Sequence, residues 1–406
     1  MFDQKKKLIA VAIAGSFALP LTAEAQSNVE IYGRLYPEVV NLSLSGATAT
    51  GAKVATMSAA AAGTPGTTTL LMDSPNSRLG FRGSEDLGGG MKAIYQLEMG
   101  FGVDAGLNSS STAGALFSRN TFVGMKGGFG TVKLGSMDTV YKELGDTMSY
   151  LGISSGNFMS TSNILSKPGF GTSSASSFHL RRANSLYYES PEFGGLQALY
   201  DYSFGEVPGN TSSLRVISAG LKYEAGPLYL AVAYETHNNL FGASKNVPAG
   251  LANPTTGAVV TSMDTGMRWT AQYKFNADSR IEGNFATIKY DESGGAATRF
   301  ANYKHNAWSI GGEHKIGAVT LVASYGQAGA GSCARVGGIA CDTTGLDGNM
   351  LDLGVGYSFS KRTFVFAFYT KLTNGSSATY TNVVSDARPT PGQDIGTFAL
   401  GIKHDF

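Results

Sequence analysis

The feature that most constrains the fold of this chain is a two-residue alternation of apolar and polar side chains, which recurs in short segments along most of its length. In one such segment, Leu351, Leu353 and Val355 alternate with Asp352 and glycines. Successive side chains of a β-strand point to opposite faces. The alternation therefore predicts strands with one apolar face and one polar face.

These segments occur in pairs joined by short turns, and longer loops separate one pair from the next, as in a series of β-hairpins. A tight acidic turn, SEDLGGG, joins the first such pair, and Phe364, Phe366 and Phe368 make another apolar stripe near the C-terminus. The other predicted strands are 28–40, 117–126, 130–138, 183–190, 195–204, 215–224, 227–236, 264–275, 279–290, 304–314, 317–327, 349–359, 362–373 and 394–406. With the two strands that flank SEDLGGG, the count is sixteen.

This pattern predicts an all-β fold, a closed antiparallel barrel of sixteen strands that crosses a membrane. An even-numbered closed barrel leaves no unpaired backbone groups in lipid. Only 15% of the residues are charged, which is low for a soluble protein of this length. Aromatic residues suit the girdles at the membrane interfaces: Tyr200, Tyr202, Phe204, Trp269 and Tyr273. A soluble β-sandwich, whose strands also alternate, is the alternative fold.

The N-terminal residues are expected to be an export signal rather than part of the fold. Three lysines at 5–7 precede an apolar run over 8–19, and Ala-Glu-Ala at 23–25 is a small-residue cleavage site. The apolar run is too short to span a membrane as a helix. We therefore assign residues 1–25 to a cleaved signal peptide and residues 26–406 to the barrel.

Two long loops interrupt the strands. The first, residues 41–75, is rich in alanine, threonine and glycine and is expected to be extracellular and flexible. The second, residues 139–182, is far longer than an ordinary connection and is therefore functional or disordered. Its carboxylates, Glu143 and Asp146, both lie near its start. We expect this loop to fold into the barrel and to set the width and charge of a water channel, and a mobile surface loop is the alternative.

Charge and cysteine content exclude several other classes of site. Removal of residues 1–25 leaves 28 basic and 28 acidic residues, and no basic patch indicates a nucleic-acid partner. Cys333 and Cys341, eight residues apart, are most simply a loop disulfide in an exported protein. The five histidines are scattered, so we expect neither a metal site nor another cofactor. A barrel enzyme would need a catalytic group near His179 or His237, and neither lies in a recognisable motif.

Several longer motifs resemble the general diffusion porins of Gram-negative outer membranes, most closely the beta-proteobacterial branch. They are SRLGFRGSEDLGGGMKAIYQLE, the RRANSLYYESPEFGG stretch, YSFSKRTFVFAFYTKLTN and the C-terminal IGTFALGIKHDF. The resemblance implies an outer-membrane homotrimer in contact with lipid and lipopolysaccharide, with the third extracellular loop folded into the pore. It also implies that assembly machinery recognises the terminal Phe406. The long first loop and the paired cysteines depart from the family pattern.

The resemblance further implies a basic cluster on the channel wall. Arg78, Arg119 and Arg181 match its arginines, Arg182 is an unusual second arginine, and Arg34 is a further candidate. We expect these residues, with Arg82 and Lys133, to give a mild preference for anions by raising the local anion concentration. Facing carboxylates would be Glu143 and Asp146. Alternatively, some of the cations pair with Glu30, Glu98 or Asp138 and only hold the wall.

The sequence therefore predicts a channel for ions and small hydrophilic solutes that is not an enzyme. A solute-specific outer-membrane channel and a structural or adhesive barrel are the alternatives.

Overall fold

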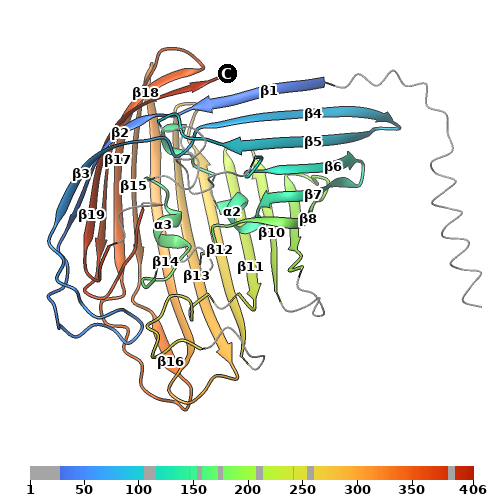
Figure 1. Cartoon of the computed structure of the whole chain (residues 1–406). Coiled ribbons are helices and arrows are strands. Elements are labelled where there is room, and N and C mark those ends of the chain that lie inside the picture. Colours follow the sequence, from blue (N-terminus) through green and yellow to red (C-terminus); the bar gives the residue numbers. More distant parts are fainter. Residues whose placement is uncertain are drawn as a thin grey trace, which may run out of the picture.

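The computed structural model describes residues 28–104, 116–145, 147–152, 158–171, 177–206, 214–240, 242–253, 260–382 and 389–406. The predicted export signal at 1–25 and Asp146 lie outside these residues. Within the described ranges, nineteen strand segments form one antiparallel sheet (Figure 1).

The first segments are β1 (Asn28–Leu35), β2 (Glu38–Ser45), β3 (Thr67–Asp73), β4 (Arg78–Gly88), β5 (Met91–Gly100), β6 (Thr121–Gly127), β7 (Gly130–Asp138), β8 (Arg181–Glu189), β9 (Leu196–Ser203) and β10 (Arg215–Ala225). The others are β11 (Leu228–Asn238), β12 (Thr261–Lys274), β13 (Ser279–Ser293), β14 (Phe300–Ile316), β15 (Val319–Ala328), β16 (Ser332–Arg335), β17 (Gly348–Ser358), β18 (Thr363–Asn374) and β19 (Asp394–Asp405). Between β7 and β8 lie three short helices, α2 (Val140–Gly145), the 3-10 helix η1 (Tyr150–Gly152) and α3 (Ser162–Leu165).

The nineteen segments form sixteen strands, because three pairs of segments are interrupted halves of one strand. β1 and β2 are two halves of one strand, because both pair with β19. β3 pairs with β2, and β4 pairs with β1, so β3 and β4 are the two halves of the next strand. β15 and β16 both pair with β14. The predicted sixteen-stranded antiparallel barrel is thus confirmed.

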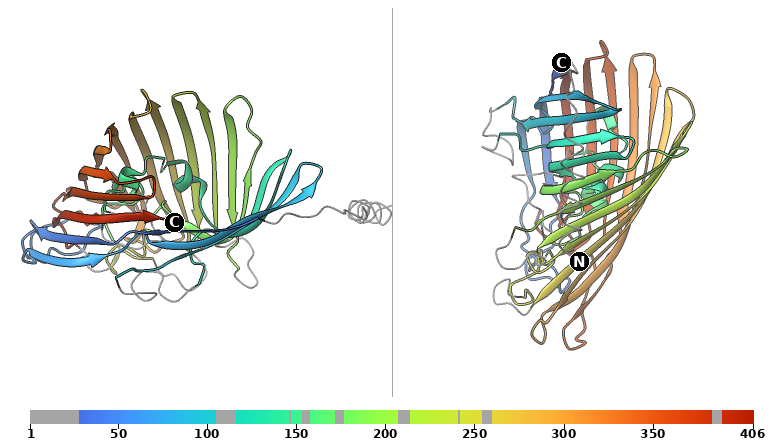
Figure 2. Two further views of the ribbon diagram at one scale, coloured as in Figure 1. Left: turned by 90° about the horizontal axis from the view of Figure 1, so that it is seen from above. Right: turned by 90° about the vertical axis from the view of Figure 1, so that its right-hand side faces the viewer.

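The ends of the chain close the barrel. Gly33 and Phe406 exchange two backbone hydrogen bonds of 3.0 and 3.1 Å, and the Phe406 ring covers Gly33. A side chain at position 33 would collide with that ring, because its Cβ would lie 2.4 Å from it. The last residue therefore completes the seam between β19 and the first strand, so no long strand edge is left unpaired. Seen from above, the sheet curves around a central space (Figure 2).

The two faces of the wall differ as the alternation predicts. Leu351, Leu353 and Val355 are exposed on the outside, whereas Asp352 is buried on the inside. Tyr200, Phe204, Trp269 and Tyr273 also lie on the exposed outer face. Among the described helices, none is long and apolar enough to span a membrane.

The sequence places the three phenylalanines of β18 in an apolar stripe like those that face lipid, but in the structure they face inwards. Phe364, Phe366 and Phe368 are at most 8% exposed. Tyr36 stacks on Phe366 with ring centroids 4.7 Å apart, and Phe158 packs 6.1 Å from Phe368. This stripe is therefore not a lipid-facing surface but packs against Tyr36 and Phe158.

The prediction of one continuous loop over 41–75 is wrong at both ends. β2 extends to Ser45, and β3 pairs with it along its whole length. Leu70 and Met72 of β3 face outwards at 71% and 56% exposure, so this strand also alternates. Its run of threonines, which are β-branched and favour strands, resembles the low-complexity loop beside it.

The short helices between β7 and β8 pack on the face of the wall that carries the buried side chains. α2 contacts β10, β11 and β12, and α3 contacts β14, β15 and β17. The Tyr229 hydroxyl donates to the Leu144 carbonyl at 3.0 Å, and the Tyr141 amide donates to Ser218 Oγ at 2.9 Å. Buried apolar side chains such as Leu144 and Ile164 fix both helices against the strands.

Candidate pore constriction

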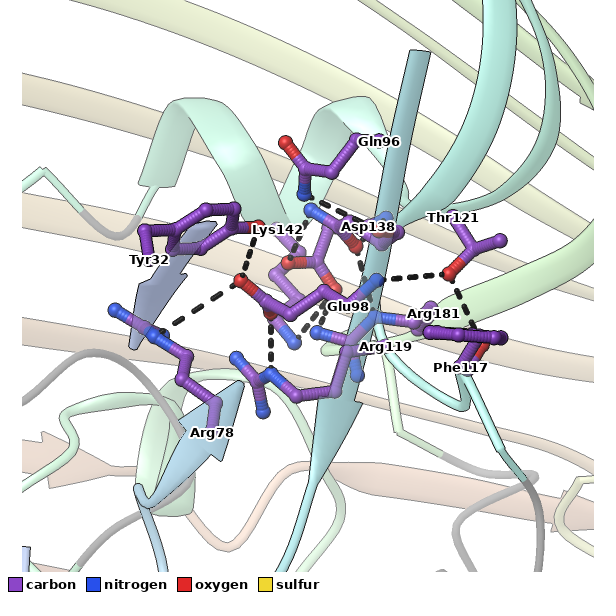
Figure 3. Close-up of polar contacts among 11 residues, drawn as sticks. Tyr32, Arg78, Gln96, Glu98, Phe117, Arg119, Thr121, Asp138, Lys142 and Arg181 are labelled. Carbon is purple, nitrogen blue, oxygen red and sulfur yellow. Dashed lines mark hydrogen bonds and ion pairs between the residues drawn. The ribbon is translucent and has the colours of Figure 1, made fainter. Parts of the chain in front are cut away.

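A buried carboxylate, Glu98 of β5, joins several polar side chains on the inner wall near α2 (Figure 3). Arg119 Nε donates to its carboxylate at 2.5 Å, and the Tyr32 hydroxyl donates at 3.0 Å. Arg78 Nε lies 3.9 Å from the second carboxylate oxygen. Glu98 therefore holds two arginines that the sequence assigned to the pore.

The contact between Tyr32 and Glu98 depends on the glycine that separates them across the sheet. Tyr32 lies opposite Gly80, and Gly80 lies opposite Glu98. The Tyr32 ring crosses Gly80 so closely that a Cβ there would lie 2.4 Å from it. Any larger residue at position 80 would therefore prevent the Tyr32 hydroxyl from reaching Glu98.

A second carboxylate, Asp138 at the end of β7, holds the other half of the cluster. It forms ion pairs of 2.9 Å with both Arg181 and Lys142. Asn120 joins these groups, because its side-chain oxygen accepts from Arg181 Nε at 2.8 Å and from the Asp138 amide at 3.1 Å. β7, β8 and helix α2 thus meet at one point.

A bulge in β8 brings Arg181 into this position. The register of β7 and β8 shifts between Gly135 and Met137, opposite Asn184, whose φ is 57°. After the shift, Arg181 lies directly across from Asp138. Bulges commonly re-aim side chains in this way next to functional sites.

We call the group formed by Arg78, Glu98, Arg119, Asp138, Lys142 and Arg181 the constriction cluster. Its four cations and two carboxylates leave two positive charges. The side chains of Arg78, Arg119 and Arg181 are about one-fifth exposed, at 21%, 21% and 19%. They are therefore held in place by carboxylates but remain accessible to water inside the barrel.

Of the four predicted cations that lie outside this cluster, three pair with carboxylates. Arg34 pairs with Asp405 at 2.7 Å. Arg82 forms two hydrogen bonds of 2.7 and 2.8 Å with Glu30, and about half of each side chain is exposed. Lys133 pairs with Glu189. Of these contacts, only that between Arg82 and Glu30 is one that the structural alternative names; its other partners, Glu98 and Asp138, pair with arginines of the cluster.

The loop carboxylates are placed differently from the expectation. Glu143 accepts a hydrogen bond of 2.7 Å from the Tyr187 hydroxyl of β8, and the carboxylates in contact with the arginines are Glu98 and Asp138. Asp146 lies outside the described residues. Arg182 interacts electrostatically with Asp201 of β9.

Sequence reasoning missed Lys142, although its spacing contained a usable signal. Lys142 follows Asp138 by four residues, which is the separation of neighbouring charges on a helical turn. The sequence offers Glu98 and Asp138 only as structural partners of the cations, because the alternation gives the face of a residue but not its neighbours.

The structure joins Cys333 of β16 to Cys341, in the loop that follows this strand, by a disulfide with Cα atoms 5.5 Å apart. The adjacent Asp342 binds the loop between β2 and β3 through Lys53 at 3.0 Å and through two hydrogen bonds with Thr56. Hydrogen bonds from Thr344, together with Lys53, lower the pKa of the Asp342 carboxyl to about 2.

The histidines considered for catalysis do not form an open site. His237 is fully buried between Glu235 and Asp264, and Phe178 stacks on its ring at 4.4 Å. His179 follows Phe178 in the same loop. Across the described segments, no three histidine, cysteine, aspartate or glutamate side chains are grouped as a metal site.

Two comparisons with relatives agree with this architecture. Outer membrane porin protein 32 of Delftia acidovorans is 29% identical over 419 residues, which cover 99% of this chain and all of that protein. Major outer membrane protein P.IB of Neisseria meningitidis serogroup B is 31% identical over 244 residues. That match covers 58% of this chain, and the chain spans only 61% of the length of P.IB.

Solved structures share the fold. The anion-selective porin from Comamonas acidovorans has a TM-score of 0.66 at 22% identity and covers 94% of this chain and all of that one. A trimer form of OmpT from Vibrio cholerae has a TM-score of 0.61 at 18% identity, with 94% and 99% covered. The model of the Gram-negative porin family matches residues 10–377. The chain therefore belongs to the Gram-negative porin family, and its barrel is that of an outer-membrane protein.

Proposed function

We propose that this protein is a general diffusion channel that passes ions and small hydrophilic solutes and prefers anions mildly. The observation that carries the proposal is the excess of two positive charges in the constriction cluster, on side chains that water can reach. Low-dielectric walls focus such a field and raise the local anion concentration. Pairing with Glu98 and Asp138 limits the attraction, so anions are drawn in without being trapped.

The proposal includes a narrowing of the channel by the segment 139–182. α2 contributes Lys142 to the cluster through its ion pair with Asp138, and the buried face of α2 is fixed by Tyr229 and Ser218. A helix held at two such points presents its charge at a constant place. Preorganised charge of this kind acts on ions without further rearrangement.

Reversal potentials across planar bilayers test the selectivity. The purified protein in a gradient of potassium chloride should show a potential of the sign expected for anion preference, and this potential should shrink at high salt because screening shortens the reach of the charges. A cation-selective channel would refute the proposal. A barrel without conductance would favour a structural or adhesive role.

Further parts of the proposal concern assembly. We propose a homotrimer, supported by the trimer form of the Vibrio protein, and export by the signal at 1–25 into an outer membrane containing lipopolysaccharide. Recognition of Phe406 by assembly machinery fits its place at the barrel seam. Native mass spectrometry of the purified protein in detergent tests the trimer, and a monomer as the main species would contradict it.

A further inference from the structure

A cavity of about 250 Å³ lies on the inner wall, away from the constriction cluster and close to the end of the barrel where the short hairpin turns are found. Its wall is formed by β13, β14, β15, β17, β18 and β19, and Ser149 and Leu151 cover it from the segment around η1. The elements that the cluster uses, β4 to β8, contribute nothing to it. It is therefore a separate site in the same lumen.

The cavity carries an excess of positive charge. Arg280, Lys315 and Lys403 line it together with one carboxylate, Glu313. Glu313 lies 3.2 Å from Arg280 and 3.8 Å from Lys315, so two cations share it. Among the described residues, Arg280 Nε has no hydrogen-bond partner. That atom is itself buried, but the Arg280 side chain as a whole is 25% exposed, so other parts of it remain open to the cavity that it lines.

Lys403 adds to this excess. It lies 3.1 Å from Asp405, which also pairs with Arg34 at 2.7 Å. Counting Arg34 and Asp405 with the lining residues gives four cations and two carboxylates. The excess of two positive charges therefore persists when the nearest neighbours are included.

One side of the cavity is aromatic. The Phe364 ring lies directly on Gly356, where a Cβ would come within 1.8 Å of it, and stacks at 6.2 Å on Phe366. Lys403 Nζ lies 5.8 Å from the centroid of the Phe364 ring. The same cavity thus offers a fixed aromatic surface and a cation beside it.

The covering loop is held in an uncommon conformation. Leu151 has φ 51° and ψ 30°, in the left-handed region that branched side chains seldom adopt, and it is 1% exposed. Backbone outliers of this kind persist only where the surroundings fix them, and they are frequent at binding sites.

We infer that this cavity binds small aromatic carboxylates, with the ring against Phe364 and the carboxylate between Arg280 and Lys403. The volume is below the usual range for drug-sized ligands, about 300 to 1,000 Å³, so a single-ring acid is the expected size. A simple inorganic anion would gain nothing from the ring. The inference rests on the proposed function, because a solute reaches this cavity through the channel.

Saturation-transfer NMR on the full-length purified protein in detergent tests the site, with benzoate as the probe. Acetate has the charge without the ring, and benzyl alcohol has the ring without the charge. We expect transfer to the benzoate ring protons and competition by neither control at equal concentration. If acetate displaced benzoate at equal concentration, the charge alone would account for binding, and the aromatic part of the inference would be overturned.

Variants locate the binding. Phe364→Leu keeps an apolar side chain but removes the ring, and Lys403→Gln removes the charge; each should weaken benzoate binding at least threefold. Phe359→Leu is the matched control, because Phe359 is 67% exposed on the outer face, and it should bind like the wild type. Unchanged binding in both pocket variants would overturn the site.

The chloride preference of the same samples separates this inference from the proposed function. If the channel prefers anions but benzoate does not bind, only the inference about the cavity is refuted. If benzoate binds but the channel prefers cations, only the proposed selectivity is refuted. Circular dichroism shows whether each variant has kept its barrel.

Discussion

Replacing Glu98 by glutamine should increase the preference of the channel for anions. Glu98 neutralises part of the charge of Arg119, at 2.5 Å, and of Arg78, at 3.9 Å. Glutamine has the same size and still accepts a hydrogen bond from the Tyr32 hydroxyl. The substitution therefore raises the charge of the constriction cluster from two to three with little change in packing.

The size of the effect follows from Coulomb's law. A monovalent ion that passes about 7 Å from a unit charge in water interacts with it by about 0.6 kcal/mol. At 0.1 M salt the Debye length is about 10 Å, and screening reduces this energy to about 0.3 kcal/mol. Loss of the carboxylate favours anions and disfavours cations by this amount, so their ratio of permeabilities should rise about threefold.

Reversal potentials of Glu98→Gln and wild-type channels in the same potassium chloride gradient measure this ratio. The difference should vanish near 1 M salt, where the Debye length is about 3 Å. Glu30→Gln is the matched control, because it removes the carboxylate of the half-exposed pair with Arg82 outside the cluster. An unchanged or lower anion preference in Glu98→Gln, or an equal change in the control, would refute the reasoning.

Three further predictions follow from the same contacts. Arg181→Gln should lower the anion preference about threefold by the same Coulomb estimate, whereas Arg82→Gln should leave it unchanged; equal reversal potentials for both would show that position in the cluster does not matter. Gly220→Val should displace α2, because a Cβ at position 220 lies 2.5 Å from a methyl group of Leu144, and should cost about 1–3 kcal/mol of stability and change the conductance. Gly283→Val is the control, because the nearest atom to a Cβ at position 283 is the Ser309 carbonyl oxygen at 3.9 Å; it should change neither the thermal unfolding nor the single-channel conductance. The lowered pKa of Asp342 means that the ion pair of its carboxylate with Lys53, in the loop between β2 and β3, is fully present above about pH 4, the ordinary aspartate range, and is lost as the pH falls through about 2. Hydrogen exchange of residues 46–66, corrected for intrinsic rates, should therefore match at pH 5 and pH 7 and rise in Asp342→Asn; equal exchange in the variant would contradict this link.

The sequence alone determined the wall of the barrel. Each strand has a lipid side and a water side. Neighbouring residues such as Leu351 and Asp352 differ so strongly in polarity that the two-residue alternation alone assigns each of them to one side. The resemblance to the general diffusion porins, rather than this alternation, assigned Arg78 and Arg119 to the channel wall, and in the structure both contact Glu98 of β5. Short glycine-containing turns between alternating segments then gave the number and order of most strands.

Strands with two apolar faces needed the tertiary structure. In β18, Phe364 and Phe366 alternate with Val365 and Ala367, so neither face is marked as the wet one. Contacts with Tyr36 and Phe158, far away in the sequence, bury the phenylalanines inside the barrel. Alternation cannot choose between two apolar faces, and here only long-range packing decided.

The constriction cluster was likewise decided by tertiary contacts. The bulge opposite Asn184 sets which residue of β8 lies across from Asp138, and α2 carries Lys142 to the same carboxylate. A one-residue shift of register reverses the faces of every later side chain. Local periodicity thus determines which residues can face the channel. Strand register and loop packing determine which of these residues contact each other, because register and packing depend on pairings between distant segments that the local pattern does not specify.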